Sequence, residues 1–264
     1  FLCGSASRPD PRCQKARHML ATGLLLTLQS TASTLQSTAY DLLVIGAGSG
    51  GIGAAKYAAK FGQRVAVIEK ARYGGDCTWS GCVPSKTLLA SAKRAHAART
   101  ASKYGVSTGD IQVDMRVVKG RIDEVVQRIY EEDDSPAAFA KLGIETITGT
   151  ASFVDRSTLA VRPASGGDDV MLTARNGILI ATGARPRTPK IQGLESVPYL
   201  TYESIFELER LPARMTVVGG GPIGCELSQA FSRLGSSVTL VANKLLPNDE
   251  PEAGRALEAA LTGE

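Results

Sequence analysis

Residues 41–51, DLLVIGAGSGG, decide how this chain folds, because an apolar run leads directly into a glycine-rich turn. The run Asp41–Ile45 predicts a buried β-strand. Three glycines behind it, Gly46, Gly48 and Gly51, fit the pattern G-x-G-x-x-G. An alanine-rich helix is expected over residues 52–61, and a second strand over residues 64–68, ending at Glu69. Together these segments predict a complete βαβ unit.

Each glycine of this turn has a physical role in binding a dinucleotide. Gly46 permits the tight turn, Gly48 lets the backbone approach a pyrophosphate, and Gly51 lets the helix pack against the strand. The free N–H groups at the helix start attract phosphate oxygens. An acid about 20 residues further on can accept hydrogen bonds from a ribose. The predicted contacts are Gly46, Gly48, Ser49, Gly50, Gly51, Glu69 and Lys70.

The pattern occurs again near the end of the chain. A strand expected over residues 215–218 leads into GGGPIGCE, in which Gly219, Gly221 and Gly224 repeat the spacing. A helix is expected over residues 227–234 and a strand over residues 237–241. Two such units in one chain predict two bound nucleotides, the second held by Gly219, Gly221, Ile223, Gly224 and Glu226. The second strand is followed by Lys244 rather than an acid, which favours NADP over NAD.

Cys77 and Cys82 form the second chemical feature. Zinc sites usually combine two closely spaced pairs of ligands, and this chain has no second pair and only two histidines. Residues five apart lie on different faces of a regular helix, so a Cys77–Cys82 bridge needs an irregular turn, which Gly81 can supply. Pro84 suits the first turn of a helix that extends to residue 98. Cys82 therefore stands near a helix N-terminus, which favours a thiolate. The alternative is a pair of buried structural cysteines.

The segment Gly74–Lys86, GGDCTWSGCVPSK, resembles the active-site segment of class I pyridine nucleotide–disulfide oxidoreductases of the dihydrolipoamide dehydrogenase and mercuric reductase-like type. The resemblance implies FAD and NAD(P)H as cofactors. It implies that Cys77 is the interchange thiol, that Cys82 lies against the flavin, and that Lys86 lies near the flavin N5. Glu226 matches a glutamate that pairs with this lysine, and Gly75 belongs to the predicted FAD contacts.

The middle of the chain completes the predicted flavin domain. Helices are expected over residues 121–129 and from Ser135 onward, and a strand over residues 144–147. Ala151 matches a position that touches the adenine end of FAD in the family. Short strands at residues 152–154, 158–161 and 170–173 predict a β-meander with a turn at residues 166–168. A strand at residues 178–184 ends in Thr182 and Gly183, which resemble a second FAD motif.

The predicted fold class is therefore α/β. Residues 40–190 are expected to form a three-layer, Rossmann-like FAD-binding domain with an inserted meander, and residues 191–264 an incomplete Rossmann-like NAD(P)-binding domain. The resemblance covers roughly the first half of a full family member. It implies that a third FAD motif and a dimerisation domain, which supplies a His–Glu acid–base pair in homodimeric relatives, lie outside this sequence. We therefore expect a truncated product.

Residues 1–39 are expected to form a leader outside the fold. They hold +3 of the formal net charge of +4 and contain a short apolar run at residues 19–28. This composition predicts a targeting peptide for an organelle, a plastid or mitochondrion, or for the secretory route. The alternative is a disordered leader on a cytoplasmic protein. The apolar run is too short to span a membrane, and the nearly neutral remainder argues against nucleic acid as a partner.

The predicted function is electron transfer from NAD(P)H through FAD to the Cys77–Cys82 disulfide, and on to a disulfide or another thiol-reactive acceptor. The acceptor is expected to be a small molecule or a protein, and no metal is expected. Two alternatives stay open. One is a nucleotide-binding fragment without turnover, because the His–Glu pair is missing. The other is an unfolded truncation with an exposed sheet edge after Val241.

Overall fold

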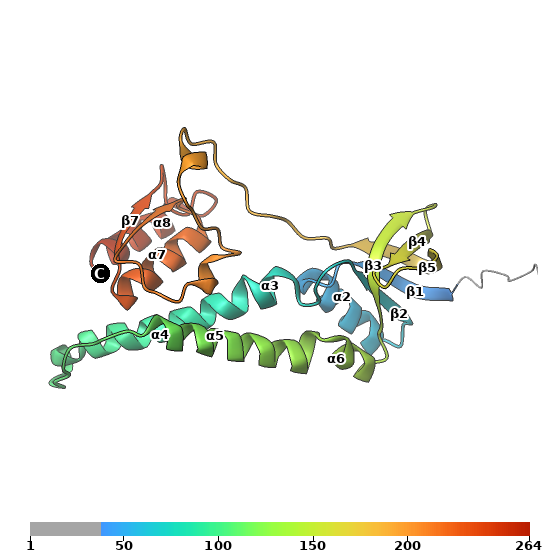
Figure 1. Cartoon of the computed structure of the whole chain (residues 1–264), viewed down its shortest axis with the longest axis horizontal. Helices are drawn as coiled ribbons and strands as arrows, with labels where there is room; N and C mark the ends of the chain where they lie inside the picture. Colours follow the sequence, from blue (N-terminus) through green and yellow to red (C-terminus); the bar gives the residue numbers. More distant parts are fainter. Residues whose placement is uncertain (1–37) are drawn as a thin grey trace, which may run out of the picture. The chain divides into compact units, whose positions relative to one another are not determined.

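The computed structural model describes residues 38–264 (Figure 1). The predicted leader lies outside the described residues except for its last two. These belong to the first strand, which begins at Thr38 rather than at the predicted Asp41. The carbonyl of Ala39 accepts a hydrogen bond from Arg64, and the Arg64 guanidinium lies over the Tyr40 ring. These contacts extend the strand toward the N-terminus.

The first βαβ unit is present as predicted. Strand β1 (Thr38–Ile45) is followed by helix α2 (Ser49–Lys60) and strand β2 (Val65–Glu69). The two strands are parallel, with Leu42 opposite Val65 and Ile45 opposite Ile68. A buried parallel pair joined by a crossover helix is the core of a dinucleotide-binding fold.

The meander closes the sheet into a barrel with the strand order β1-β2-β3-β4-β5. Strand β3 (Glu145–Phe153) pairs in parallel with β2 over its first half and antiparallel with β4 (Thr158–Pro163) over its second. The strands predicted separately at residues 144–147 and 152–154 are thus one strand. It stays continuous because its backbone changes partner between Thr148 and Gly149.

Strand β5 (Val170–Ile180) likewise unites two predicted strands, residues 170–173 and 178–184, and ends four residues earlier than the second prediction. Its first part pairs antiparallel with β4. The polar residues between the two predicted strands do not break it, because Arg175 pairs with Asp41 and Asn176 donates to Gln63. The amide of Ala181 then donates to Ile45 of β1 at 2.8 Å.

Six helical segments lie between β2 and β3. Helix α3 (Gly75–Trp79), which the sequence did not predict, precedes α4 (Cys82–Arg99) and the short 3-10 turn η1 (Ala101–Tyr104). Helix α5 (Met115–Ile129) begins six residues before the predicted start, because Asp114 accepts a hydrogen bond from the Arg116 amide and caps it. A π-helical turn, η2 (Tyr130–Asp134), leads into α6 (Pro136–Lys141), capped by Ser135 as predicted.

The last part of the chain contains the second βαβ unit. Residues 181–190 form no helix or strand, and the turns η3 (Leu194–Ser196) and η4 (Ile205–Glu207) follow. Strand β6 (Arg214–Val218), helix α7 (Pro222–Leu234) and strand β7 (Ser237–Val241) then follow. Both strands match the prediction to within one residue, whereas the helix begins five residues before its predicted start. The two strands form a parallel sheet of their own. Helix α8 (Pro251–Thr262) has no predicted counterpart.

Two buried clusters lie on opposite faces of β1 and β2. Val65 and Val67 face α2 and α6 in one cluster, and Ala66 and Ile68 face the meander strands in the other. Successive residues of a strand point to opposite faces, so β2 is buried on both. The parallel strands thus lie between helices on one face and the meander strands on the other.

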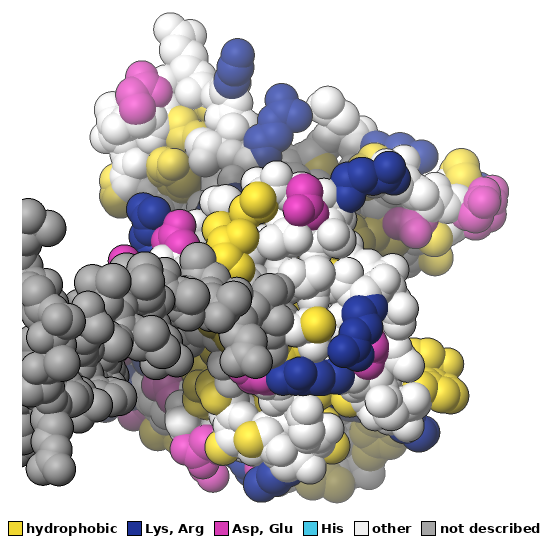
Figure 2. Space-filling model, turned by 90° about the vertical axis from the view of Figure 1, so that its right-hand side faces the viewer, with side chains coloured by type: hydrophobic (Ala, Val, Ile, Leu, Met, Phe, Trp, Pro, Cys, Tyr) yellow, Lys and Arg dark blue, Asp and Glu magenta, His cyan; other side chains and the backbone are white. Residues whose placement is uncertain are grey.

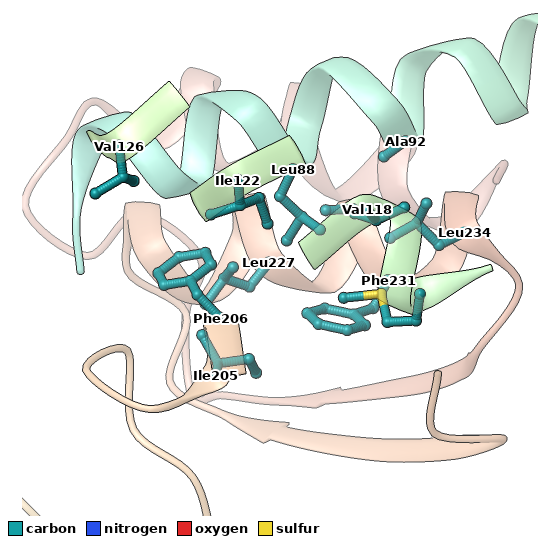
Figure 3. Close-up of a cluster of buried hydrophobic side chains, with 12 residues drawn as sticks. Leu88, Ala92, Val118, Ile122, Val126, Ile205, Phe206, Leu227, Phe231 and Leu234 are labelled. Atoms are coloured by element: carbon teal, nitrogen blue, oxygen red, sulfur yellow. The ribbon is translucent and has the colours of Figure 1, made fainter. Parts of the chain in front are cut away.

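A third cluster joins the two predicted domains (Figure 3). It combines Leu88 of α4 and Ile122 of α5 with Phe206 of η4 and Phe231 of α7. Both phenylalanine side chains are buried, and Phe231 is fully so. The predicted boundary at residue 190 thus separates segments that share one hydrophobic core, and it stays a prediction.

Basic and acidic side chains are interspersed on the face of the molecule drawn in Figure 2, with no large area of one sign there. Among residues 38–264, no helix is long and apolar enough to cross a membrane.

Candidate functional site

The first glycine loop has the geometry that the pattern G-x-G-x-x-G predicts. Gly46 has φ +102°, and a Cβ there would also overlap the carbonyl of Ala181. A Cβ on Gly51 would overlap the carbonyl oxygen of Gly46. Gly48 is the N-cap of α2, and no side chain caps the helix. The first backbone N–H groups of a helix have no intrahelical partner, so this end of α2 presents donors to a ligand.

Glu69, predicted to face a ribose, also holds the glycine loop in place. One carboxylate oxygen accepts from the Ala47 amide and the other from the Ala71 amide, both at 2.8 Å. Each oxygen has a second lone pair, so the carboxylate can still accept a hydroxyl hydrogen. The acid therefore fixes the end of β2 against the turn that follows β1.

The segment that carries Cys77 packs directly on the first glycine loop. The Gly74 amide donates to the Ala47 carbonyl at 2.8 Å. A Cβ on Gly75, which has φ +59°, would come within 2.5 Å of the Gly48 Cα. The glycines that precede Cys77 thus allow two backbone loops to touch, and the predicted thiol stands next to the predicted phosphate site.

A cavity of about 830 Å³ lies at this junction. Ten of the predicted contacts line it: Gly46, Gly48, Ser49, Gly50, Glu69, Lys70, Gly75, Ala151, Thr182 and Gly183. Gly51 does not, because it packs underneath the loop. Cys77 lines the cavity, whereas Cys82, Lys86 and Glu226 are not among its lining residues.

The two cysteines stand on either side of a break between helices. Helix α3 ends at Trp79, and α4 begins at Cys82 after Gly81, where a Cβ would come within 2.8 Å of the Asp76 carbonyl oxygen. This is the irregular turn expected at Gly81. Cys77 is half-buried and Cys82 is exposed, and both are free thiols here. Burial, with the neighbouring Cys82 side chain as the next cause, raises the pKa of the Cys77 thiol to about 11.

Several residues that surround Cys77 were not predicted as part of the site. The Trp79 indole donates to the Tyr73 carbonyl at 2.6 Å, and the Arg72 guanidinium lies over its ring. Thr78 donates to Asp134 from η2, and Tyr202 donates to Asp76 at 3.4 Å. Arg72, Asp76 and Trp79 also line the cavity. Their proximity to Cys77 in the sequence was the available signal for these three, whereas no local pattern points to Asp134 or Tyr202.

The predicted pairing of Lys86 with Glu226 is confirmed. The Lys86 Nζ donates to both carboxylate oxygens, at 2.8 Å and 2.7 Å. Lys86 lies one turn after Cys82 on α4, and Glu226 lies two residues after Gly224 on α7. The ion pair therefore links the helix of Cys82 to the second glycine loop.

The second glycine loop repeats the geometry of the first. Gly219 has φ +124°, a Cβ on Gly224 would overlap the Gly219 carbonyl oxygen, and no side chain caps α7. A further cavity of about 530 Å³ lies between α7, β7 and α8, and Lys244 lines it. The predicted contacts Gly219, Gly221, Ile223, Gly224 and Glu226 do not line that cavity.

Within residues 38–264, no group of three or more histidine, cysteine, aspartate or glutamate side chains could hold a metal ion.

Comparisons with known proteins agree with this geometry. The sequence model of one family, described as pyridine nucleotide-disulphide oxidoreductase, matches residues 40–264. The chain is 39% identical to a mercuric reductase of Streptomyces lividans over 223 residues, covering 84% of this chain and 46% of that protein. It is 36% identical to a mercuric reductase of Shigella flexneri, covering 97% of this chain and 44% of the relative.

A dihydrolipoyl dehydrogenase of Bacillus subtilis (strain 168) is 33% identical over 232 residues, covering 85% of this chain and 49% of the relative. The chain thus spans less than half the length of each of these three relatives.

Proposed function

This chain belongs to the family of pyridine nucleotide-disulphide oxidoreductases, and from that premise we propose that it passes electrons from NAD(P)H through FAD to Cys77 and Cys82. Enzymes of this family use FAD and NAD(P)H. One observation carries the proposal for this chain: Cys77 lines the cavity that the first glycine loop builds, with Cys82 next to it in space.

The cavity fits a dinucleotide such as FAD in its chemistry. Its volume of about 830 Å³ lies within the range of roughly 300–1,000 Å³ typical of ligand sites. The uncapped start of α2 offers N–H donors to a pyrophosphate, and the Glu69 carboxylate offers acceptors to a ribose. We propose that Ala151 and Thr182 line the remainder of the cofactor. Bound FAD would supply two-electron exchange between a nicotinamide and a disulfide.

The cysteine pair then carries the chemistry of this chain. Two electrons and two protons convert the Cys77–Cys82 disulfide into two thiols. The Cys77 thiolate attacks one sulfur of an acceptor disulfide, forms a mixed disulfide and releases the other acceptor sulfur as a thiolate. The Cys82 thiolate next attacks the Cys77 sulfur, releases the second acceptor thiol and restores the starting disulfide. The acceptor in this scheme is a small-molecule or protein disulfide.

The second glycine loop supports a role for residues 191–264 as part of an NAD(P)-binding domain. Its contact with α4 through Lys86 and Glu226 links the proposed nicotinamide site to the helix of Cys82. Lys244 after β7 leads us to propose NADPH as the preferred donor. We further propose that the whole protein is a homodimer, as the resemblance implies.

Anaerobic visible absorption spectra of the purified protein, recorded before and after adding NADPH, test the proposal. We expect a flavin spectrum that is bleached by NADPH and gains a long-wavelength band. Cys82→Ser should lose that band while it keeps the flavin. A flavin spectrum that dithionite changes and NADPH does not would instead support a nucleotide-binding chain without turnover.

Gly48→Val separates binding from folding in the same assay. The atom nearest to a Cβ on Gly48 is the Gly75 Cα at 3.8 Å, so the fold has room for the first added carbon. The side chain would project where a pyrophosphate approaches the backbone. We expect a folded variant without flavin, and normal flavin content would refute the assignment of this loop.

A further inference from the structure

Helix α3, which carries Cys77, is tied to a buried carboxylate from a distant part of the chain. The Thr78 hydroxyl donates to the Asp134 Oδ2 at 2.5 Å. Thr78 is 2% exposed and Asp134 is 9% exposed. A short hydrogen bond to a carboxylate away from water is one of the stronger contacts that a hydroxyl can make. Because Thr78 directly follows Cys77 in α3, the hydrogen bond also fixes the backbone position of Cys77.

Asp134 lies in an unusual backbone segment. It ends the π-helical turn η2, between the last residue of α5 and the Ser135 cap of α6. Isolated π-helical turns are frequent at functional sites. The first residue of the same turn also contacts α3, since the Tyr130 ring lies 5.0 Å from the Trp79 ring. One short turn therefore touches both residues that follow Cys77.

The charge of Asp134 is only partly compensated. The Lys56 Nζ on α2 stands 4.0 Å from the Asp134 Oδ1 and also lies over the Phe139 ring of α6. Cys82 on α4 and Asp134 on η2 act on the pKa of Cys77. The charged side chains of the cavity that Cys77 lines are Glu69, Lys70, Arg72, Asp76 and Arg185. Burial is the largest cause of the raised pKa of Cys77, the Cys82 side chain is the next, and the negative charge of Asp134 adds a smaller contribution in the same direction.

We propose that Asp134 is a positioning residue, whose buried carboxylate fixes the Cys77 helix α3 through Thr78 and places a negative charge beside that helix. The assignment rests on the proposed function only in taking Cys77 as the interchange thiol. The two cysteines therefore stand in different surroundings. Cys77 keeps its proton until an acceptor or a base reaches it, and Cys82 is the first residue of a long helix. Lys56 moderates the effect of the carboxylate.

The rate of Cys77 alkylation by iodoacetamide as a function of pH tests this assignment. The full chain is reduced first, and mass spectrometry of its peptides follows each cysteine separately. Asp134→Asn keeps an acceptor for Thr78 and removes the charge, so Cys77 should react roughly threefold faster or more at pH 8. Lys56→Met should act in the opposite direction, because it leaves the carboxylate uncompensated. The Cys225 peptide, from a buried cysteine on α7, serves as the internal control.

Two further variants separate charge from anchoring. Thr78→Val breaks the hydrogen bond and keeps the charge, so it should raise Cys77 reactivity at every pH by loosening α3. Thr78→Ser keeps the hydroxyl and should behave as the parent protein. Unchanged Cys77 profiles in both Asp134→Asn and Lys56→Met would overturn the assignment. If Asp134→Asn does not fold, Lys56→Met decides alone: slower Cys77 alkylation than in the parent protein supports the assignment, and an equal or faster rate refutes it.

The assay needs neither FAD nor NADPH, so its outcome is independent of electron transfer. Loss of NADPH-driven reduction in the parent protein would refute the proposed function and leave the assignment of Asp134 standing. Normal NADPH-driven reduction, together with Cys77 alkylation profiles that do not shift in the variants, would support the proposed function and refute the assignment of Asp134.

Discussion

Replacing Gly51 by alanine, with Gly53→Ala as the matched control, tests whether the first glycine loop is held by backbone contact. Both glycines lie in the first turns of α2. A Cβ on Gly51 would overlap the Gly46 carbonyl oxygen and approach the Val44 side chain, whereas a Cβ on Gly53 meets nothing within 4 Å. The two variants therefore make the same chemical change in the same helix and differ only in what surrounds it.

The expected effects have opposite signs. An alanine in a helix stabilises by about 0.5–1 kcal/mol relative to glycine, so Gly53→Ala should raise the free energy of unfolding by that amount. Overpacking costs about 1–3 kcal/mol, and the upper end applies to Gly51 because a backbone carbonyl cannot rotate away. The net loss for Gly51→Ala is then about 2 kcal/mol, and the two variants should differ by about 3 kcal/mol.

Urea unfolding followed by circular dichroism measures these free energies, and visible absorbance measures retained flavin. Gly51→Ala should also lose flavin, because the start of α2 must withdraw from the strand, and Gly53→Ala should keep it. Equal unfolding midpoints for the two variants would refute the close packing of α2 on Gly46.

Three more predictions follow from other parts of the structure. Phe231→Ala removes a fully buried ring from the cluster shared by α4, α5 and α7, and should cost about 3–5 kcal/mol in urea unfolding. The control, Phe61→Ala, truncates a ring that is 64% exposed and should change stability by less than about 0.5 kcal/mol. The Cys77 thiol is neutral when protonated and its pKa is raised from 9.0 to about 11, so the unfolded chain ionises first as the pH rises. Stability under reducing conditions should therefore hold below pH 9 and fall between pH 9 and pH 11, and Cys77→Ser should flatten that fall. Lys244→Glu should shift the ratio of dissociation constants for NADPH and NADH toward NADH by at least roughly tenfold, and an unchanged ratio would exclude Lys244 from donor selection.

The sequence predicted the parts of the fold that depend on neighbouring residues. Both glycine turns, the helices behind them and the break at Gly81 were confirmed, because turn chemistry and short-range packing determine them. The lengths of β3 and β5 were wrong, because partners elsewhere in the chain decide where a strand stops. Arg175 illustrates this: its polarity suggests a loop, yet its pairing with Asp41 keeps it inside β5.

The candidate site shows the same division. The pairing of Lys86 with Glu226 could be predicted because the resemblance names both positions, although 140 residues separate them. The role of Asp134 could not be predicted, because its hydrogen bond with Thr78 depends on a π-helical turn that no short sequence pattern indicates. The raised pKa of Cys77 could not be predicted either, because its largest cause is burial, which depends on how α3 packs in the folded chain.

Helix α4 has a consequence for any attempt to recombine this protein with its relatives. Its first residue is Cys82, its middle packs on α7 through Leu88, and its last residue, Arg99, donates to the carbonyls of Arg233 and Leu234 at the end of α7. A chimera joined at residue 190 would put a foreign α7 against this helix. Exchange with a relative would therefore have to replace α4, α5 and α7 together, because these three helices share one hydrophobic core.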